Sequence, residues 1–169
     1  SLTQNQYGVS IGGPIIKNKL FFFANFEKDE VTELGSSFVP NTGSGALNES
    51  RVLESDLQLV SSILSQVSIG NGQMYNPGAY EGFTYDANST KGLFKLDWNI
   101  NDNHRLAFVY NFLTASKEKP AHPTALGFRG PNATTLQFEN AGYEINNNMN
   151  SFLVELNSSF NEETSNKLQ

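Results

Sequence analysis

The chain has 169 residues and a net charge of −6, which is enough for one domain, and its lack of cysteine excludes disulfides and thiolate chemistry. An acidic chain without a cluster of lysine and arginine also argues against nucleic acid as a partner. The 12% share of aromatic residues favours strands, because aromatic side chains suit a pleated, half-buried surface.

The first two predicted elements are strands over residues 5–12 and 20–28. In the first, Tyr7, Val9 and Ile11 alternate with glycine and serine, which is the period of a strand. The segment GGPIIKNK, residues 12–19, predicts a turn, with glycine and proline as its signals. In the second strand, one face carries Leu20, Phe22, Ala24 and Phe26, and the other carries Phe21, Phe23, Asn25 and Glu27.

Residues 92–100 and 105–112 predict a hairpin. Both segments alternate, and the residues between them are asparagine, aspartate and histidine, of which the first two tolerate the conformations of a tight turn. The apolar rows are Phe94, Leu96, Trp98 and Ile100 in the first segment, and Leu106, Phe108, Tyr110 and Phe112 in the second.

A further strand is predicted over residues 150–160. Its apolar side carries Phe152, Val154, Leu156 and Phe160, and its polar side carries Glu155, Asn157 and Ser159. Another strand is expected to begin near Asn166. The segment has no obvious terminus at either end, so we interpret it as a piece of a longer protein.

Two connections are long, over residues 29–91 and 113–149, and the others are short. Long structureless loops are uncommon in compact soluble domains, whereas alternation of short turns and long loops is typical of a membrane-spanning antiparallel barrel. The first loop contains a predicted helix over residues 48–67, with Asn48 suited to cap its start. In the second loop, residues 136–145 are expected to form a short strand pair.

The apolar rows have two interpretations, because they point inward in a soluble sandwich or lipocalin-like barrel and outward in a membrane barrel. Aromatic residues near strand ends suit a membrane interface, and the strands approach the ~9–11 residues that a tilted crossing needs. We therefore expect one set to face lipid, namely Phe94, Leu96, Trp98, Leu106, Phe108 and Tyr110. We expect the other to face a lumen, namely Lys95, Asp97, Asn99, Arg105, Asn111, Glu155 and Asn157.

Three consecutive phenylalanines follow the first predicted turn. In a barrel, Phe22 would face lipid, whereas Phe21 and Phe23 would face the lumen. A polar water channel does not favour two luminal phenylalanines, but a plugged barrel does. An ordinary buried strand is the alternative interpretation.

No pattern of catalytic or ligand-binding residues is present. The two histidines, His104 and His122, have no second ligand at metal spacing, and neither a phosphate loop, a dinucleotide fingerprint nor a nucleophile elbow occurs. The chain is therefore predicted to be no enzyme and to hold neither a metal nor a cofactor.

The segment "NQYGVSIGGPIIKNKLFFFANFEKDE", residues 5–30, resembles the large TonB-dependent outer-membrane receptors of the Oar-like type. In that family, a strand ending in Gly-Gly-Pro-Ile precedes a lysine-containing turn and a phenylalanine-rich strand that ends near Asn-x-Glu. The matching residues here are Gly12, Gly13, Pro14 and Ile15, then Lys17 and Lys19, then Phe21, Phe22 and Phe23, and finally Asn25 and Glu27. Weaker similarity continues through residues 95–112 and 138–160.

The resemblance implies a bacterial outer-membrane location and an all-β fold, namely an antiparallel transmembrane barrel closed by a plug. Residues 1–169 would form part of one barrel domain, with five to six strands, short periplasmic turns and long extracellular loops. The implied function is uptake of a bulky ligand, driven by the TonB energy-coupling complex. No segment here matches the plug or the box that contacts TonB.

The implied partners are outer-membrane lipid, the plug of the same protein, the coupling complex, a surface lipoprotein and an unknown ligand. Two alternatives remain open from the sequence. One is a passive porin or adhesin barrel, and the other is a soluble β-rich domain that binds carbohydrate.

Overall fold

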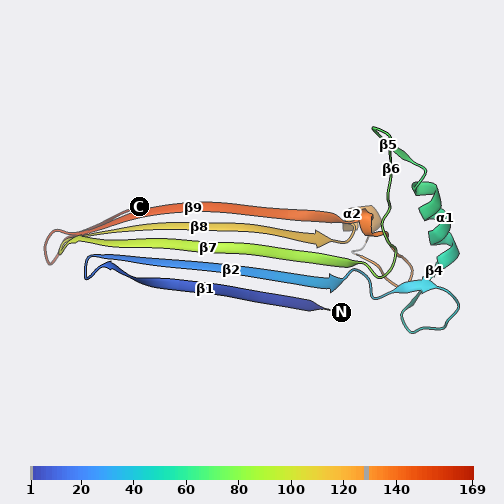
Figure 1. The fold of residues 1–169 in the computed structure, drawn as a ribbon, viewed down its shortest axis with the longest axis horizontal. Helices are drawn as coiled ribbons and strands as arrows, with labels where there is room; N and C mark the ends of the chain where they lie inside the picture. Colours follow the sequence, from blue (N-terminus) through green and yellow to red (C-terminus); the bar gives the residue numbers. More distant parts are fainter. Residues whose placement is uncertain (1, 128–129) are drawn as a thin grey trace. The chain divides into compact units, whose positions relative to one another are not determined.

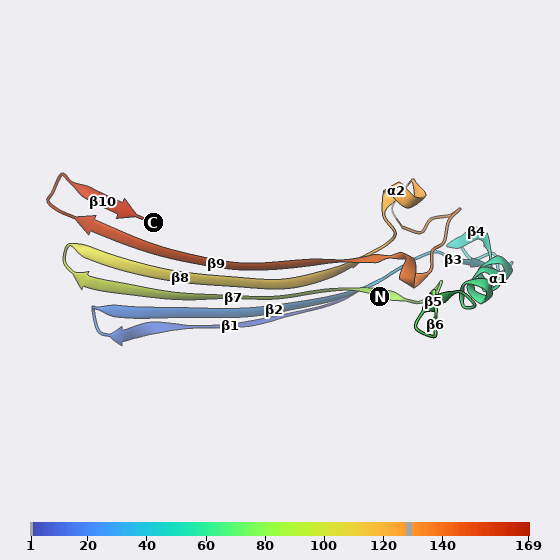
Figure 2. The same cartoon turned by 90° about the horizontal axis from the view of Figure 1, so that it is seen from above.

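A six-stranded antiparallel sheet dominates the computed structural model, which describes residues 2–127 and 130–169 (Figure 1). Its strands are β1 (Thr3–Ile16), β2 (Leu20–Leu34), β7 (Thr84–Asn101), β8 (His104–Lys119), β9 (Tyr143–Ser159) and β10 (Ser165–Leu168). Neighbours in the sheet follow the order of the chain, and Figure 2 shows β10 beside β9. This meander confirms the predicted all-β antiparallel class.

The remaining elements lie in the long connections. They are the parallel pair β3 (Val39–Asn41) and β4 (Glu49–Leu53), the antiparallel pair β5 (Ser68–Gly70) and β6 (Gln73–Met74), the helices α1 (Glu54–Leu64) and α2 (Pro123–Leu126), and a 3₁₀-helix at Glu139–Ala141. Among the described residues, no helix has both the length and the apolar character to cross a membrane.

The chain forms two compact units. The sheet unit comprises Gln4–Glu30, Asn88–Ser116 and Asn146–Gln169. The loop unit comprises Val31–Ala87 and Lys117–Ile145, with the start of the chain up to Thr3. Strands β1, β2, β7, β8 and β9 contribute residues to both units.

The strands are longer than the sequence pattern predicts. Strands β1, β2, β7, β8 and β9 contain 14, 15, 18, 16 and 17 residues, and the connections shorten to 35–83 and 120–142 in consequence. The reason is that apolar alternation marks only the part of a strand with an apolar face. Backbone hydrogen bonding continues through residues such as Asn88 and Thr114, which carry no such signal.

The predicted turn over residues 12–19 is confirmed at its end but begins too early, because Gly12, Gly13 and Pro14 lie within β1. The chain instead reverses at Asn18, whose φ is 61°, and the Lys19 backbone N–H donates to the Ile16 carbonyl at 3.0 Å.

The predicted helix over 48–67 is shorter, and its predicted cap is wrong. Helix α1 begins after Leu53, whose side chain makes no capping hydrogen bond. The Asn48 side-chain amide donates instead to the Ser37 carbonyl at 2.6 Å. The strand pair expected at 136–145 is also wrong, since this segment holds the 3₁₀-helix and the start of β9.

The loop unit has a small core around Phe83, which is 6% exposed. Its ring fills the space beside Gly35, where a Cβ atom would lie 2.2 Å from Phe83 Cε2. The Gly35 N–H donates to the Phe83 carbonyl at 2.9 Å, and the Tyr85 ring meets the Phe83 ring edge-on at 5.5 Å. The Tyr85 hydroxyl in turn accepts a hydrogen bond from Gln137. Phe83 therefore joins segments that are distant in the sequence.

A second organising contact in the loop unit is the Glu49 carboxylate, which receives hydrogen bonds from a tight turn. The Thr42, Ser44 and Gly45 backbone N–H groups donate to it at 2.7, 3.2 and 3.1 Å, as do the Thr42 and Ser44 hydroxyls at 3.2 Å. These donors, the Thr42 N–H first among them, hold the pKa of Glu49 below its ordinary value of 4.5.

We expect acid to loosen this turn. Because folding lowers the pKa of Glu49, its contribution to stability is present above its ordinary pKa of 4.5 and is lost as pH falls through the lower folded value. Hydrogen exchange, corrected for intrinsic rates, should show residues 42–45 losing protection at acidic pH. Glu49→Gln should lose it already at neutral pH, whereas Glu81→Gln, at an exposed position, should not. Unchanged protection in Glu49→Gln would contradict this role.

Candidate functional site

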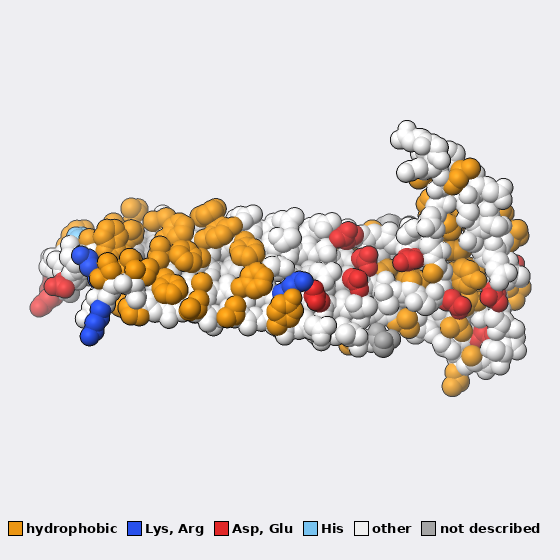
Figure 3. Space-filling model, in the orientation of Figure 1, with side chains coloured by type: hydrophobic (Ala, Val, Ile, Leu, Met, Phe, Trp, Pro, Cys, Tyr) orange, Lys and Arg blue, Asp and Glu red, His pale blue; other side chains and the backbone are white. Residues whose placement is uncertain are grey.

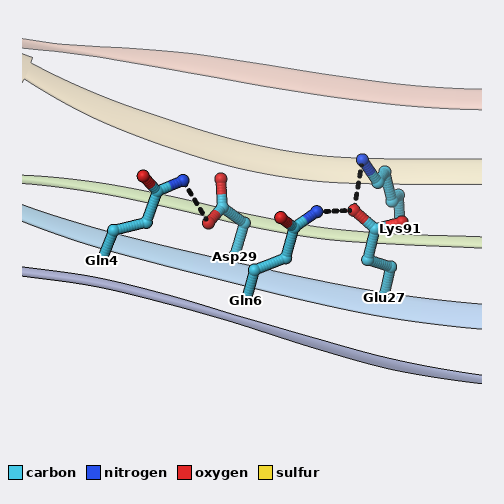
Figure 4. A network of polar contacts seen from close by, with 5 residues as sticks. All are labelled: Gln4, Gln6, Glu27, Asp29 and Lys91. Atoms are coloured by element: carbon cyan, nitrogen blue, oxygen red, sulfur yellow. Dashed lines mark hydrogen bonds and ion pairs between the residues drawn. The ribbon is translucent and has the colours of Figure 1, made fainter.

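Hydrogen bonds and an ion pair between β1, β2 and β7 define one face of the sheet (Figure 4). The Gln4 amide donates to Asp29 at 3.3 Å, and the Gln6 amide donates to Glu27 at 2.6 Å. The Lys91 ammonium lies 2.7 Å from the same Glu27 carboxylate. Alternate residues of a strand share a side, so these contacts fix which residues lie on this surface, called the polar face below.

The polar face continues across β7, β8 and β9 and contains the residues predicted to be luminal. Ion pairs join Lys95 to Asp97 and Lys167 to Glu155, both at 2.9 Å. A hollow of about 380 Å³ brings together six of the seven predicted residues, namely Lys95, Asp97, Asn99, Arg105, Glu155 and Asn157. The seventh, Asn111, lines a separate hollow beside Lys91.

Aromatic contacts between β8 and β9 define the opposite, apolar face. The Tyr110 ring stacks on Phe152 with centroids 4.6 Å apart, and Phe108 lies 6.4 Å from Phe152. The Tyr110 hydroxyl donates to the Asn150 side-chain oxygen at 2.7 Å. In Figure 3, hydrophobic side chains gather over the part of the sheet next to the short turns.

A contact with Gly92 extends the apolar face to β7. A Cβ atom at Gly92 would lie 2.3 Å from Phe112 Cε1, so the Phe112 ring occupies the space that this glycine leaves free. Strand alternation then places the even-numbered residues of β7 on this face. All six residues predicted to face lipid therefore share it, namely Phe94, Leu96, Trp98, Leu106, Phe108 and Tyr110.

The apolar face has no buried interior within the described residues. Phe94 is 37% exposed, Trp98 42% and Phe152 69%, and no large side chain in the described chain is fully buried. A soluble sandwich would bury this row against a second sheet. The row begins at Phe152 on β9 and ends at Phe160, the residue after the strand, about 27 Å away at ~3.4 Å per residue. A tilt of ~40° reduces this to about 21 Å, close to the ~25 Å apolar band of membrane barrels.

Glycines on the polar face of β1 permit close packing that the sequence analysis missed. A Cβ atom at Gly12 would lie 3.1 Å from Phe23 Cδ2, and one at Gly8 would lie 2.8 Å from the Phe26 carbonyl oxygen. The family-motif residues Gly12 and Phe23 thus meet across neighbouring strands. Phe23 remains 41% exposed, which is unusual for a phenylalanine on a face lined by ion pairs.

Each histidine has a ring nitrogen within hydrogen-bonding distance of a hydroxyl group. His104 Nδ1 is 2.8 Å from the Ser158 hydroxyl, and His122 Nδ1 is 2.9 Å from the Thr124 hydroxyl. Within residues 2–127 and 130–169, no group of three histidine, cysteine, aspartate or glutamate side chains is arranged to hold a metal ion.

Residues 1–50 match the family model described as an outer membrane beta barrel domain. No curated protein and no solved structure matches the chain. The family match and the two-faced sheet locate the chain in the bacterial outer membrane, as part of an antiparallel transmembrane β-barrel. This location is incompatible with the alternative of a soluble carbohydrate-binding domain.

Proposed function

We propose that this chain forms part of the wall of a TonB-dependent transporter that takes up a bulky ligand. The proposal includes a plug from the same protein that fills the barrel lumen. The observation that carries it is the presence of exposed phenylalanine on the polar face, opposite a face suited to lipid.

The apolar face is the surface that contacts lipid in this proposal. Its aromatic cluster ends at Phe112, 6.2 Å from the Tyr110 ring. On β9 the Asn150 side chain accepts a hydrogen bond from Tyr110, and beyond it the same side carries Asn148 and Asn146. A tyrosine whose ring packs among apolar groups and whose hydroxyl meets a polar group suits the boundary of a membrane. Phe112 and the Tyr110 hydroxyl thus mark one edge of the hydrocarbon layer.

The polar face is then luminal, and its aromatic residues favour a lumen filled by a protein plug. Phe23 lies over Gly12, and Phe21 shares its side of β2 by alternation. In a water-filled lumen these rings would remain hydrated, which is unfavourable for apolar surface. A plug packed against the wall would cover them.

The loop unit is the proposed place of first contact with ligand or with a surface lipoprotein. Helix α1 exposes Leu59, Val60 and Ile63 by 59%, 44% and 55%, whereas Leu57 is buried. An exposed apolar row of this kind is typical of a surface that meets another molecule.

A passive porin is the second candidate, because ion pairs and a hollow of about 380 Å³ line the polar face. Electrical conductance separates the two. The full-length protein in a planar lipid bilayer should show no steady ion conductance if a plug fills the lumen. A steady conductance would identify a porin and overturn the proposal.

The same proposal predicts a leak when the luminal phenylalanines are removed. In cells, Phe21→Ser/Phe23→Ser should raise sensitivity to large hydrophilic antibiotics several-fold, because a loosened plug admits them. Phe21→Leu/Phe23→Leu keeps the apolar contact and is the matched control.

Capture of the full-length protein by the periplasmic domain of TonB tests the coupling itself, and failure of that capture would restrict the function to passive transport.

A further inference from the structure

The cations of the sheet unit differ in whether a carboxylate neutralises them. Three lysines of the polar face form ion pairs, namely Lys91 with Glu27, Lys95 with Asp97, and Lys167 with Glu155. By contrast, Lys17 and Lys19, in the turn between β1 and β2, and Arg105, near the start of β8, have no carboxylate within 4.0 Å among the described residues. The turn end of the sheet therefore carries positive charge that the described chain does not neutralise.

The three unpaired cations line one hollow of about 350 Å³. It lies where the turn between β1 and β2 meets the turn between β7 and β8, and these turns are side by side at one end of the sheet (Figure 2). Asn99 joins the turns, because its backbone N–H donates to the Lys19 carbonyl at 2.8 Å and its side-chain amide donates to the Asn18 carbonyl at 3.1 Å. Of the described residues in the lining, only Asp102 carries a carboxylate.

The hollow belongs to the polar, luminal side of the sheet. Asn99 and Arg105 also line the larger hollow of about 380 Å³ on the polar face, so the two hollows adjoin. Phe21 follows Lys19 by two positions and shares its side of β2 with Phe23, which is 41% exposed. Unneutralised positive charge and exposed aromatic surface thus lie close together at the turn end of the polar face.

An occupant that suits both features has an acidic group and an apolar surface. A small inorganic anion would neutralise the cations but would leave the phenylalanine rings hydrated, which is unfavourable for apolar surface. A protein segment can present a carboxylate beside apolar side chains. Arginine suits such a carboxylate particularly well, because its planar guanidinium can donate two parallel hydrogen bonds to it.

We propose that the plug carries acidic side chains that dock in this hollow and anchor the plug to the turn end of the barrel wall. This docking rests on the proposed function, because it requires a plug in the lumen. It assigns the plug a definite surface chemistry, namely carboxylates next to apolar side chains on the part that meets Lys17, Lys19 and Phe21.

Carbodiimide treatment of the full-length protein in outer-membrane vesicles tests the contact, because this reagent joins a lysine amine to a carboxylate that touches it. Mass spectrometry of the peptides should find Lys17 or Lys19 joined to an acidic residue of the plug. Lys91 joined to Glu27, which lies 2.7 Å away, is the internal control for the reaction. If that control is positive, the absence of a crosslink from both turn lysines, or a crosslink only to Asp102 or to another protein, would overturn the anchor.

The variant Lys17→Gln/Lys19→Gln should also loosen the plug in cells. Sensitivity to large hydrophilic antibiotics should rise by up to about fivefold for each lysine removed, because a partly exposed ion pair contributes at most about 1 kcal/mol. The matched control is Lys28→Gln/Lys117→Gln, which removes two lysines that are paired with Glu30 and Glu33 and should leave the sensitivity unchanged.

The anchor and the proposed function fail in different ways. No rise in Lys17→Gln/Lys19→Gln, or an equal rise in the control, would overturn the anchor while an unmodified protein without steady conductance keeps its plug. A steady conductance of the unmodified protein would instead overturn the plug itself.

Discussion

Phe108→Arg is expected to lower the free energy of unfolding in a lipid bilayer by about 2–4 kcal/mol. Phe108 lies at the centre of the apolar row of β8, between Leu106 and Tyr110, and contacts Phe152 on the next strand. In the proposed orientation its side chain is near the middle of the hydrocarbon layer. A guanidinium there loses its hydration, and the neighbours Leu106, Tyr110 and Phe152 offer it no carboxylate.

Val109→Arg is the matched control, because it places the same charge one residue further along the same strand. Val109 lines the hollow of the polar face together with Glu155, so an arginine there gains a carboxylate neighbour. Its effect should be below about 1 kcal/mol, the size typical of exposed ion pairs. Reversible unfolding of the full-length protein in lipid vesicles measures both changes. A larger loss for Val109→Arg than for Phe108→Arg would mean that the apolar face points inward.

The sequence predicted which residues share a face, because alternation is a property of the strand itself. Phe94, Leu96 and Trp98 lie together on β7 for this reason, as predicted. Alternation did not predict the medium outside each face, since a sandwich and a membrane barrel give the same pattern. The family match over residues 1–50 identified the surrounding medium as a membrane.

The ends of the strands were less predictable. Polar residues such as Asn88 and Asn148 continue β7 and β9, because hydrogen bonds to neighbouring strands do not require an apolar side chain. Gly12, Gly13 and Pro14 misled the prediction in the other direction, since these residue types are typical of turns but here lie within β1. Both the polar extensions of β7 and β9 and the full length of β1 depend on pairing with other strands, which neighbouring residues in the sequence do not reveal.

The contacts between glycines and aromatic rings also could not be predicted from the sequence. The pairs Gly12–Phe23 and Gly92–Phe112 depend on strand register, which brings residues 11 and 20 positions apart into contact. A glycine opposite an aromatic ring on a neighbouring strand is a recurrent way to cover exposed backbone. Once register is known, the pairs explain why these positions lack a side chain.

Phe83→Ala is expected to have the largest effect within the loop unit. Removing a buried phenylalanine ring typically costs about 3–5 kcal/mol, and Phe83 is among the few residues in this unit that are buried. The loss should be local, because the residues of the sheet unit make their own contacts. Residues 35–83 should exchange amide hydrogen faster and become more accessible to protease in the full-length protein, while the barrel remains assembled in the outer membrane.

Leu59→Ala is the control for that change, since Leu59 is 59% exposed and its truncation leaves no cavity. If the loop unit captures ligand, Phe83→Ala should weaken uptake without raising the leak expected from Phe21→Ser/Phe23→Ser, because the first disrupts a loop and the second loosens a plug. The two variants therefore separate recognition from closure of the lumen. Normal protection of residues 35–83 in Phe83→Ala would show that the loop unit does not depend on this ring.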